Sequence, residues 1–200
     1  MTSRFLKSAR WSLLALATLL LTAALPAQSV DAFLGFNTVI TKTPPDGIPK
    51  FGTGLFPTVG GDLMFLPHGL GLGGQVAWRG SQTDYFGEGV RPILFDFNLV
   101  WQPVPPGQKI RPDIAVGIGA TSLRFYTGQY SCSTFTGCTD YLSSNHAMLH
   151  ASVGLKIYLT DHIFLRPGVD FYNIRHNLEF GVPTAWQAGV AIGYTLGPSS

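Results

Sequence analysis

The residues of this sequence best suited to catalysis are His150 and Ser152, which lie two positions apart. A histidine can act as general base for a serine nucleophile when the side chains are within hydrogen-bond reach and a third group orients the imidazole. On a β-strand, residues i and i+2 share a face, so a strand here would bring the pair together. No acidic residue follows at an evident spacing: Asp170 is the nearest on the same expected face, and Glu179 falls in a loop. A hydrolase that uses His150 and Ser152 is therefore a secondary hypothesis.

The sequence contains two cysteines, Cys132 and Cys138, which enclose five residues of the longest expected loop. An export signal at the N-terminus favours a disulfide, because exported proteins reach an oxidising compartment. A metal site would need a second pair of ligands nearby, and the sequence offers none. We predict a disulfide that closes the tip of this loop, and no metal site.

The glycines Gly69, Gly71 and Gly74 match the GxGxxG spacing of a dinucleotide-binding loop. That mechanism requires a preceding buried strand and a following helix whose N-terminus meets the phosphates. The residues that follow, from Gln75, instead continue the alternation of a strand. The pattern indicates a glycine-rich strand, and we predict no cofactor.

Strict alternation of apolar and polar residues is the strongest feature of the chain. Between positions 93 and 102 one parity is apolar throughout and the other carries mostly polar groups. The apolar parity consists of Ile93, Phe95, Phe97, Leu99 and Trp101. Because side chains alternate between the two faces of a strand, this segment has one apolar and one mostly polar face.

Eight such segments predict an all-β fold. The expected strands are Val30–Lys42, Leu55–Phe65, Leu70–Gln82, Val90–Gln102, Arg111–Tyr126, Asn145–Leu159, Ile163–Asn173 and Ala185–Leu196. Tight turns alternate with longer loops near residues 43–54, 83–89, 127–144 and 174–184. Because outer-membrane barrels have short periplasmic turns and longer outer loops, we predict an eight-stranded antiparallel transmembrane β-barrel over residues 30–197. A soluble, lipocalin-like barrel with its apolar face inward is the alternative.

The first residues have the pattern of a secretory signal. Arg4, Lys7 and Arg10 precede an apolar run over residues 11–25, and small residues follow at Ala27 and Ser29. We predict a signal peptide of residues 1–27, with cleavage after Ser29 as the alternative. An uncleaved anchor is less consistent with the run, which is shorter than the roughly 20 residues of a membrane helix.

Charge and composition exclude several classes of function. The full sequence has 13 Lys and Arg against 11 Asp and Glu, and removal of the three basic signal residues leaves 10 against 11. No basic run remains to bind nucleic acid. Only 12% of the residues are charged, which argues against disorder and suits strands that face lipid.

Seven charged residues fall at the strand positions that are expected to face the barrel interior. They are Asp62, Arg79, Asp96, Asp113, Lys156, Arg166 and Asp170. Since side chains about fill the interior of an eight-stranded barrel, these groups predict a polar plug, with a small pore or a conduit for hydrophobic molecules as the alternative.

Three tryptophans fall at lipid-facing positions near strand ends, where an aromatic girdle is expected. They are Trp78, Trp101 and Trp186.

The chain resembles the small bacterial outer-membrane β-barrel families of OmpA and OmpX type, the "outer membrane protein beta-barrel domain" group. The resemblance lies in segments such as Gly60-Gly-Asp-Leu-Met-Phe, Arg91-Pro-Ile-Leu-Phe-Asp-Phe-Asn and Gly189-Val-Ala-Ile-Gly-Tyr. It implies a porin-like architecture in the outer membrane of a Gram-negative cell. It also implies a monomer whose partners are outer-membrane lipid, lipopolysaccharide and the barrel assembly machinery.

The same resemblance implies a non-enzymatic protein with a structural or surface-interaction role. The His150 and Ser152 pair is similar to the His-x-Ser pair of the outer-membrane lipid A deacylases. Those enzymes carry the pair at the lipid-facing surface, whereas the parity of this strand places it in the lumen.

Overall fold

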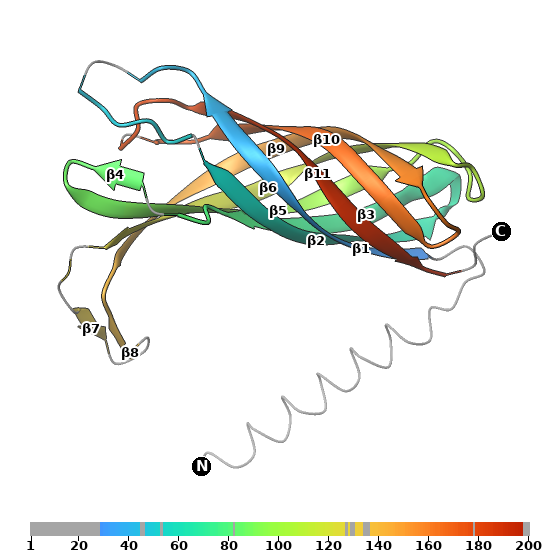
Figure 1. The fold of residues 1–200 in the computed structure, drawn as a ribbon, viewed down its shortest axis with the longest axis horizontal. Coiled ribbons are helices and arrows are strands. Elements are labelled where there is room, and N and C mark those ends of the chain that lie inside the picture. The colour runs from blue at the N-terminus through green and yellow to red at the C-terminus, as the bar shows by residue number, and fades with distance from the viewer. Residues whose placement is uncertain are drawn as a thin grey trace, which may run out of the picture.

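The computed structural model describes residues 29–44, 47–52, 54–81, 83–126, 128, 131–133, 137–177 and 179–197. Within these ranges, eight long antiparallel strands form the wall of a barrel (Figure 1). They are β1 (Ser29–Thr41), β2 (Leu55–Leu66), β3 (Leu70–Trp78), β5 (Glu88–Trp101), β6 (Ile110–Tyr126), β9 (Leu142–Tyr158), β10 (Ile163–Ile174) and β11 (Thr184–Leu196). Each strand pairs with its sequence neighbour in the wall, and pairing of β1 with β11 closes the barrel. The predicted eight-stranded barrel is confirmed. The expected signal peptide lies outside the described residues.

Three short strands and one helical turn complete the described elements. β4 (Thr83–Tyr85) pairs with the start of β5, and β7 (Ser131–Ser133) pairs with β8 (Gly137–Thr139) in a separate hairpin. The η1 turn (Pro67–Gly69) connects β2 to β3. β3 ends earlier than the sequence pattern predicts, because the chain leaves the wall after Trp78 and then forms the β4–β5 hairpin.

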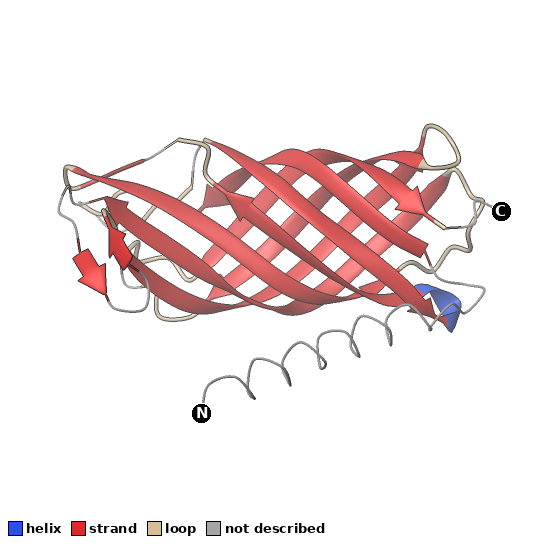
Figure 2. Cartoon of the chain, turned by 90° about the horizontal axis from the view of Figure 1, so that it is seen from below, coloured by secondary structure: helices blue, strands red, loops and turns tan. Residues whose placement is uncertain are grey.

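The two ends of the barrel differ as the loop lengths predict. The inner end carries the η1 turn and the short connections at residues 102–109 and 159–162. The outer end carries the longer loops, including β4 and the β7–β8 hairpin, and lies opposite η1 (Figure 2). The strands cross the barrel obliquely between these ends (Figure 2).

Burial alternates along each strand of the wall. The outward side chains of Phe97, Ile118 and Val153 are 74%, 67% and 62% exposed, whereas the inward Asp113 and Lys156 are fully buried. An exterior of large exposed apolar side chains is stable only against lipid, which confirms the predicted orientation of the two faces. In the described ranges, no helix combines the length and apolar composition that a membrane span requires.

Two turns brace the inner end of the barrel. The backbone N–H of Gln102 donates to the Gly69 carbonyl over 2.7 Å, and Trp101 Nε1 donates to the His68 carbonyl over 3.2 Å. Gly69 has a φ of 71°, and a Cβ there would collide with the Gln102 carbonyl. Glycine is therefore required at this contact.

Candidate functional site

Lys156 lies at the centre of a charged cluster in the inner half of the lumen. Its Nζ donates to Asp31 Oδ2 over 2.6 Å and to Asp62 Oδ2 over 2.7 Å. The two aspartates occupy directly opposite positions on β1 and β2, where like charges destabilise a sheet unless a cation lies between them. Lys156 reaches them from β9, so the cluster ties one side of the barrel to the other. Asp31 has the inward parity of β1, and sequence reasoning could have found it from that signal.

A second ion pair joins β10 to β6. Arg166 Nε donates to Asp113 Oδ2 over 2.7 Å, and the guanidinium carbon lies 4.5 Å from the centre of the Phe33 ring. Nearer the inner end, Arg111 donates to the Tyr158 hydroxyl over 3.2 Å. These contacts and the Lys156 cluster place ion pairs and hydrogen bonds across the inner half of the lumen.

The middle of the lumen contains a hydrogen-bonded network around His150. Its Nε2 lies 3.0 Å from Asp170 Oδ1, and its Nδ1 lies 2.7 Å from Asn98 Oδ1 and 3.5 Å from Asp96 Oδ1. Gln75 Nε2 donates to the same Asp170 oxygen over 3.1 Å. A Cβ at Gly117 or Gly119 would collide with the Asn98 or Asp96 side of this network, so the glycines of β6 make room for it.

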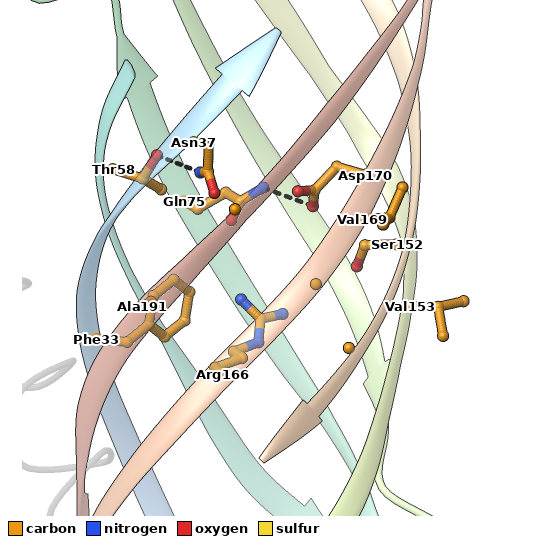
Figure 3. A pocket seen from close by; sticks show the side chains of 13 residues that line it. Phe33, Asn37, Thr58, Gln75, Ser152, Val153, Arg166, Val169, Asp170 and Ala191 are labelled. Carbon is orange, nitrogen blue, oxygen red and sulfur yellow. Dashed lines mark hydrogen bonds between the residues drawn. The ribbon is translucent and has the colours of Figure 1, made fainter. Parts of the chain in front are cut away.

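Ser152 shares the inward face with His150 but forms no hydrogen bond with it. The Ser152 hydroxyl is buried without a hydrogen-bond partner among the described residues. It borders a small cavity, about 20 Å³ in volume, whose lining includes Gln75, Arg166 and Asp170 (Figure 3). The cavity has room for a water molecule, which would supply the missing partner. The structure thus brings His150 to Asp170 and leaves Ser152 outside that contact.

Arg79 and the remaining sequence candidates lie outside these clusters. Arg79 is buried at the outer end of β3, where its Nε and Nη1 have no partner among the described residues.

Cys132 and Cys138 form a disulfide across the β7–β8 hairpin, as the sequence predicts. Gly69 ends the η1 turn, whereas Gly71 and Gly74 lie in the strand β3, as expected. The tryptophans divide between the ends: Trp101 lies at the inner end, whereas Trp78 and Trp186 lie at the outer ends of their strands.

The outer half of the lumen is apolar, which the sequence analysis did not anticipate. Inward side chains of the wall pack there with aromatic residues of three outer loops. The buried members include Val39, Phe51, Phe56, Val90, Leu94, Leu123, Met148, Ile174, Phe180 and Val182. Phe180 makes edge-to-face contacts with Phe51 and Tyr85, each with ring centres 5.2 Å apart. We call this group the apolar plug. The sequence contains one indication of this plug: the inward positions of β5 change from polar Asp96 to apolar Leu94 toward the outer end of the strand.

A polar cluster at the outer rim fastens the loop between β10 and β11 to β9. Ser144 Oγ donates to Glu179 Oε1 over 2.5 Å, and His146 Nε2 lies 3.1 Å from Glu179 Oε2. Partial burial raises the pKa of the Glu179 carboxyl. The hydrogen bond from Ser144 and the proximity of His146 outweigh that effect, so the pKa lies below its ordinary value. Ser144 and Glu179 both approach the same nitrogen of His146, which differs from the relay geometry of a catalytic triad.

This rim cluster predicts that the loop loosens in acid. Because the folded-state pKa of Glu179 is depressed, its contribution to loop stability is present above the ordinary value of 4.5 and is lost as the pH falls through the lower folded-state value. We expect backbone amides of residues 179–181 to exchange several-fold faster after acidification, once intrinsic exchange rates are subtracted. Glu179→Gln should remove most of this pH dependence. Equal pH dependence in both proteins would contradict the assignment.

Among the described residues, no group of three or more His, Cys, Asp or Glu side chains is arranged to hold a metal ion. The polar contacts of the described lumen residues are ion pairs and hydrogen bonds. Both halves are occupied by side chains of the barrel itself.

The arrangement of this barrel matches solved structures of outer-membrane proteins. The attachment invasion locus protein Ail of Yersinia pestis, in complex with the heparin analogue sucrose octasulfate, has a TM-score of 0.55 at 13% identity. The match covers 84% of this chain and 99% of Ail. The fold is that of a small outer-membrane β-barrel. No protein-family model matches the chain, and no curated protein matches it.

Two further outer-membrane barrels show the same likeness. Neisserial surface protein A has a TM-score of 0.55 at 7% identity, covering 85% of this chain and 96% of that protein. The N-terminal β-barrel domain of Pseudomonas aeruginosa OprF has a TM-score of 0.50 at 16% identity, covering 84% of this chain and 97% of that domain. The resemblance predicted from the sequence is confirmed at the level of the fold.

Proposed function

We propose that this chain is a non-enzymatic protein of the outer membrane, which spans the lipid as a plugged monomeric barrel and presents its outer loops for contact with another surface. The observation that carries the proposal is that side chains occupy both halves of the lumen. Paired charges around Lys156 fill the inner half, and the apolar plug fills the outer half. Because side chains of the described residues occupy both halves of the lumen, we place the function on the outer face.

The outer face supports a surface-interaction role in two ways. A disulfide closes the β7–β8 hairpin beyond the barrel wall, and a closed loop loses less conformational entropy when it contacts a partner. Ail, a barrel of the same fold, has been solved with a heparin analogue. The expected environment is outer-membrane lipid with lipopolysaccharide, reached through a signal peptide and the barrel assembly machinery.

The plugged lumen predicts the absence of ion conductance. In a planar bilayer, the folded chain should give no steps in the ionic current above the baseline. A general porin measured in parallel gives clear current steps. The double variant Phe51→Ala, Phe180→Ala, which thins the apolar plug, should also remain silent because the inner ion pairs are intact. Steps from the unaltered chain would favour the pore alternative and refute the proposal.

The hydrolase alternative predicts a different result. A deacylase would release fatty acid from lipopolysaccharide and lose that activity in Ser152→Ala. We expect no release from either protein, since Ser152 is buried inside the wall and forms no hydrogen bond with His150. Release that depends on Ser152 would replace the non-enzymatic proposal.

A further inference from the structure

Two arginines face each other on the outside of the barrel wall. Arg91 of β5 and Arg124 of β6 are directly opposite in the strand register. Both have the outward parity of their strands, which they share with Ile93 and Ser122. Like charges in opposite positions destabilise a sheet. Among the described residues, neither guanidinium forms an ion pair or a hydrogen bond that would offset this repulsion.

Each guanidinium is held against a tyrosine ring. The Arg124 guanidinium carbon lies 4.7 Å from the centre of the Tyr141 ring, and that of Arg91 lies 5.8 Å from the centre of the Tyr126 ring. The two rings are themselves 5.9 Å apart. Stacking on aromatic rings orients an arginine without using its N–H donors. The four side chains therefore form a positioned pair of cations with free donors.

The depth of this pair follows from the strand that carries it. Arg91 and Trp101 share the outward face of β5, with apolar residues at the outward positions between them. The ten residue steps from Arg91 to Trp101, at about 3.3 Å each and tilted about 40°, span about 25 Å across the membrane. The apolar band of an outer-membrane barrel is also about 25 Å tall. With Trp101 at the inner interface, Arg91 and Arg124 lie at the outer one.

We propose that Arg91 and Arg124 bind a phosphate group of a phosphorylated lipid in the outer leaflet. Two guanidiniums on neighbouring strands can donate parallel hydrogen bonds to the oxygens of one phosphate, the geometry that arginine favours. The bound anion neutralises the repulsion between them. This site rests on the membrane placement proposed above, and it identifies a lipid head group as one partner of the outer wall.

The test uses the folded chain in dodecyl maltoside micelles, a detergent without phosphate. Titration with diphosphorylated lipid A should raise the midpoint of thermal unfolding to a plateau, because a ligand that binds only the folded state stabilises it. The same lipid with its phosphates removed should give no such rise. The double variant Arg91→Gln, Arg124→Gln should raise the half-saturating lipid concentration at least tenfold. A rise with both lipids would show recognition of acyl chains and would overturn the proposal.

Arg175→Gln is the matched control, because Arg175 is an exposed arginine at the outer end of β10. It should leave the half-saturating concentration within twofold of the original. Inorganic phosphate in hundredfold excess should not displace lipid A, since it lacks the acyl chains that concentrate the lipid in the micelle. Displacement would overturn the assignment to a lipid head group.

Failure of the site and failure of the membrane placement give distinct results. If the chain gives no folded band that shifts on heating after refolding in maltoside, both the phosphate site and the membrane placement are refuted. A chain that folds but shows no phosphate-dependent rise refutes the site alone. If the double variant does not fold, the comparison of the two lipids on the unaltered chain still decides the question.

Discussion

Replacing Lys156 with methionine should lower the free energy of unfolding by about 3–5 kcal/mol. Lys156 is fully buried, and its ammonium group is the cation shared by Asp31 and Asp62. Removal of one partner of a buried ion pair leaves uncompensated buried charge, and here two carboxylates are left facing each other. Urea unfolding of the chain in phospholipid vesicles, followed by tryptophan fluorescence, measures the loss.

Two companion variants separate the charge effect from a general loss of packing. Lys109→Met, at an exposed position in an inner turn, should leave stability within about 0.5 kcal/mol of the original. The triple variant Lys156→Met, Asp31→Asn, Asp62→Asn should recover most of the loss, because it removes all three charges together. A single variant as stable as the original would mean that the lumen is hydrated and that the cluster does not plug it.

Val153→Arg should destabilise the barrel by about 2–4 kcal/mol, the cost of a cation on the lipid face near the bilayer midplane. Val153 lies in the inner half of β9, five residues from its inner end, is 62% exposed and points away from the lumen (Figure 3). Asn145→Arg is the matched control, since Asn145 has the same outward parity on the same strand but lies at its outer end. The control should fold as well as the original. Equal folding of both variants would mean that this face is not in lipid.

The wall of the barrel could be predicted from the sequence because its rule is local. Each strand alternates between lipid and lumen, so the parity of Phe97 and Asp96 already assigns their faces. The inward location of Lys156, Arg166 and His150 follows from the same rule. Strand ends such as Trp78 were less predictable, because there the chain leaves the wall and the alternation no longer determines its path.

The partners of the inward side chains could not be predicted. Lys156 meets Asp31 and Asp62 across the lumen, and these contacts depend on barrel closure and on the shear between strands. His150 and Ser152 were expected within hydrogen-bond reach because they share a face. The His150 ring instead meets Asp170 of the adjacent strand β10 and Asn98 of β5, and Ser152 forms no hydrogen bond with it.

The apolar plug was missed for a related reason. Phe51 and Phe180 come from loops, where no periodicity indicates whether a side chain turns into the barrel. Only the three-dimensional structure shows that they pack against inward wall residues such as Leu94 and Leu123 and so belong to the apolar plug. The same holds for Arg91 and Arg124, whose meeting depends on the register of β5 and β6.

The most direct test of the account is folding of the chain from urea into detergent micelles, followed by electrophoresis of unheated and boiled samples and by circular dichroism. A lipid-facing barrel predicts a β-rich spectrum and a band whose mobility shifts on boiling, because its apolar exterior requires a membrane-like phase. A β-rich protein that stays soluble without detergent and shows no shift would contradict it, and would place the apolar face inside a soluble barrel.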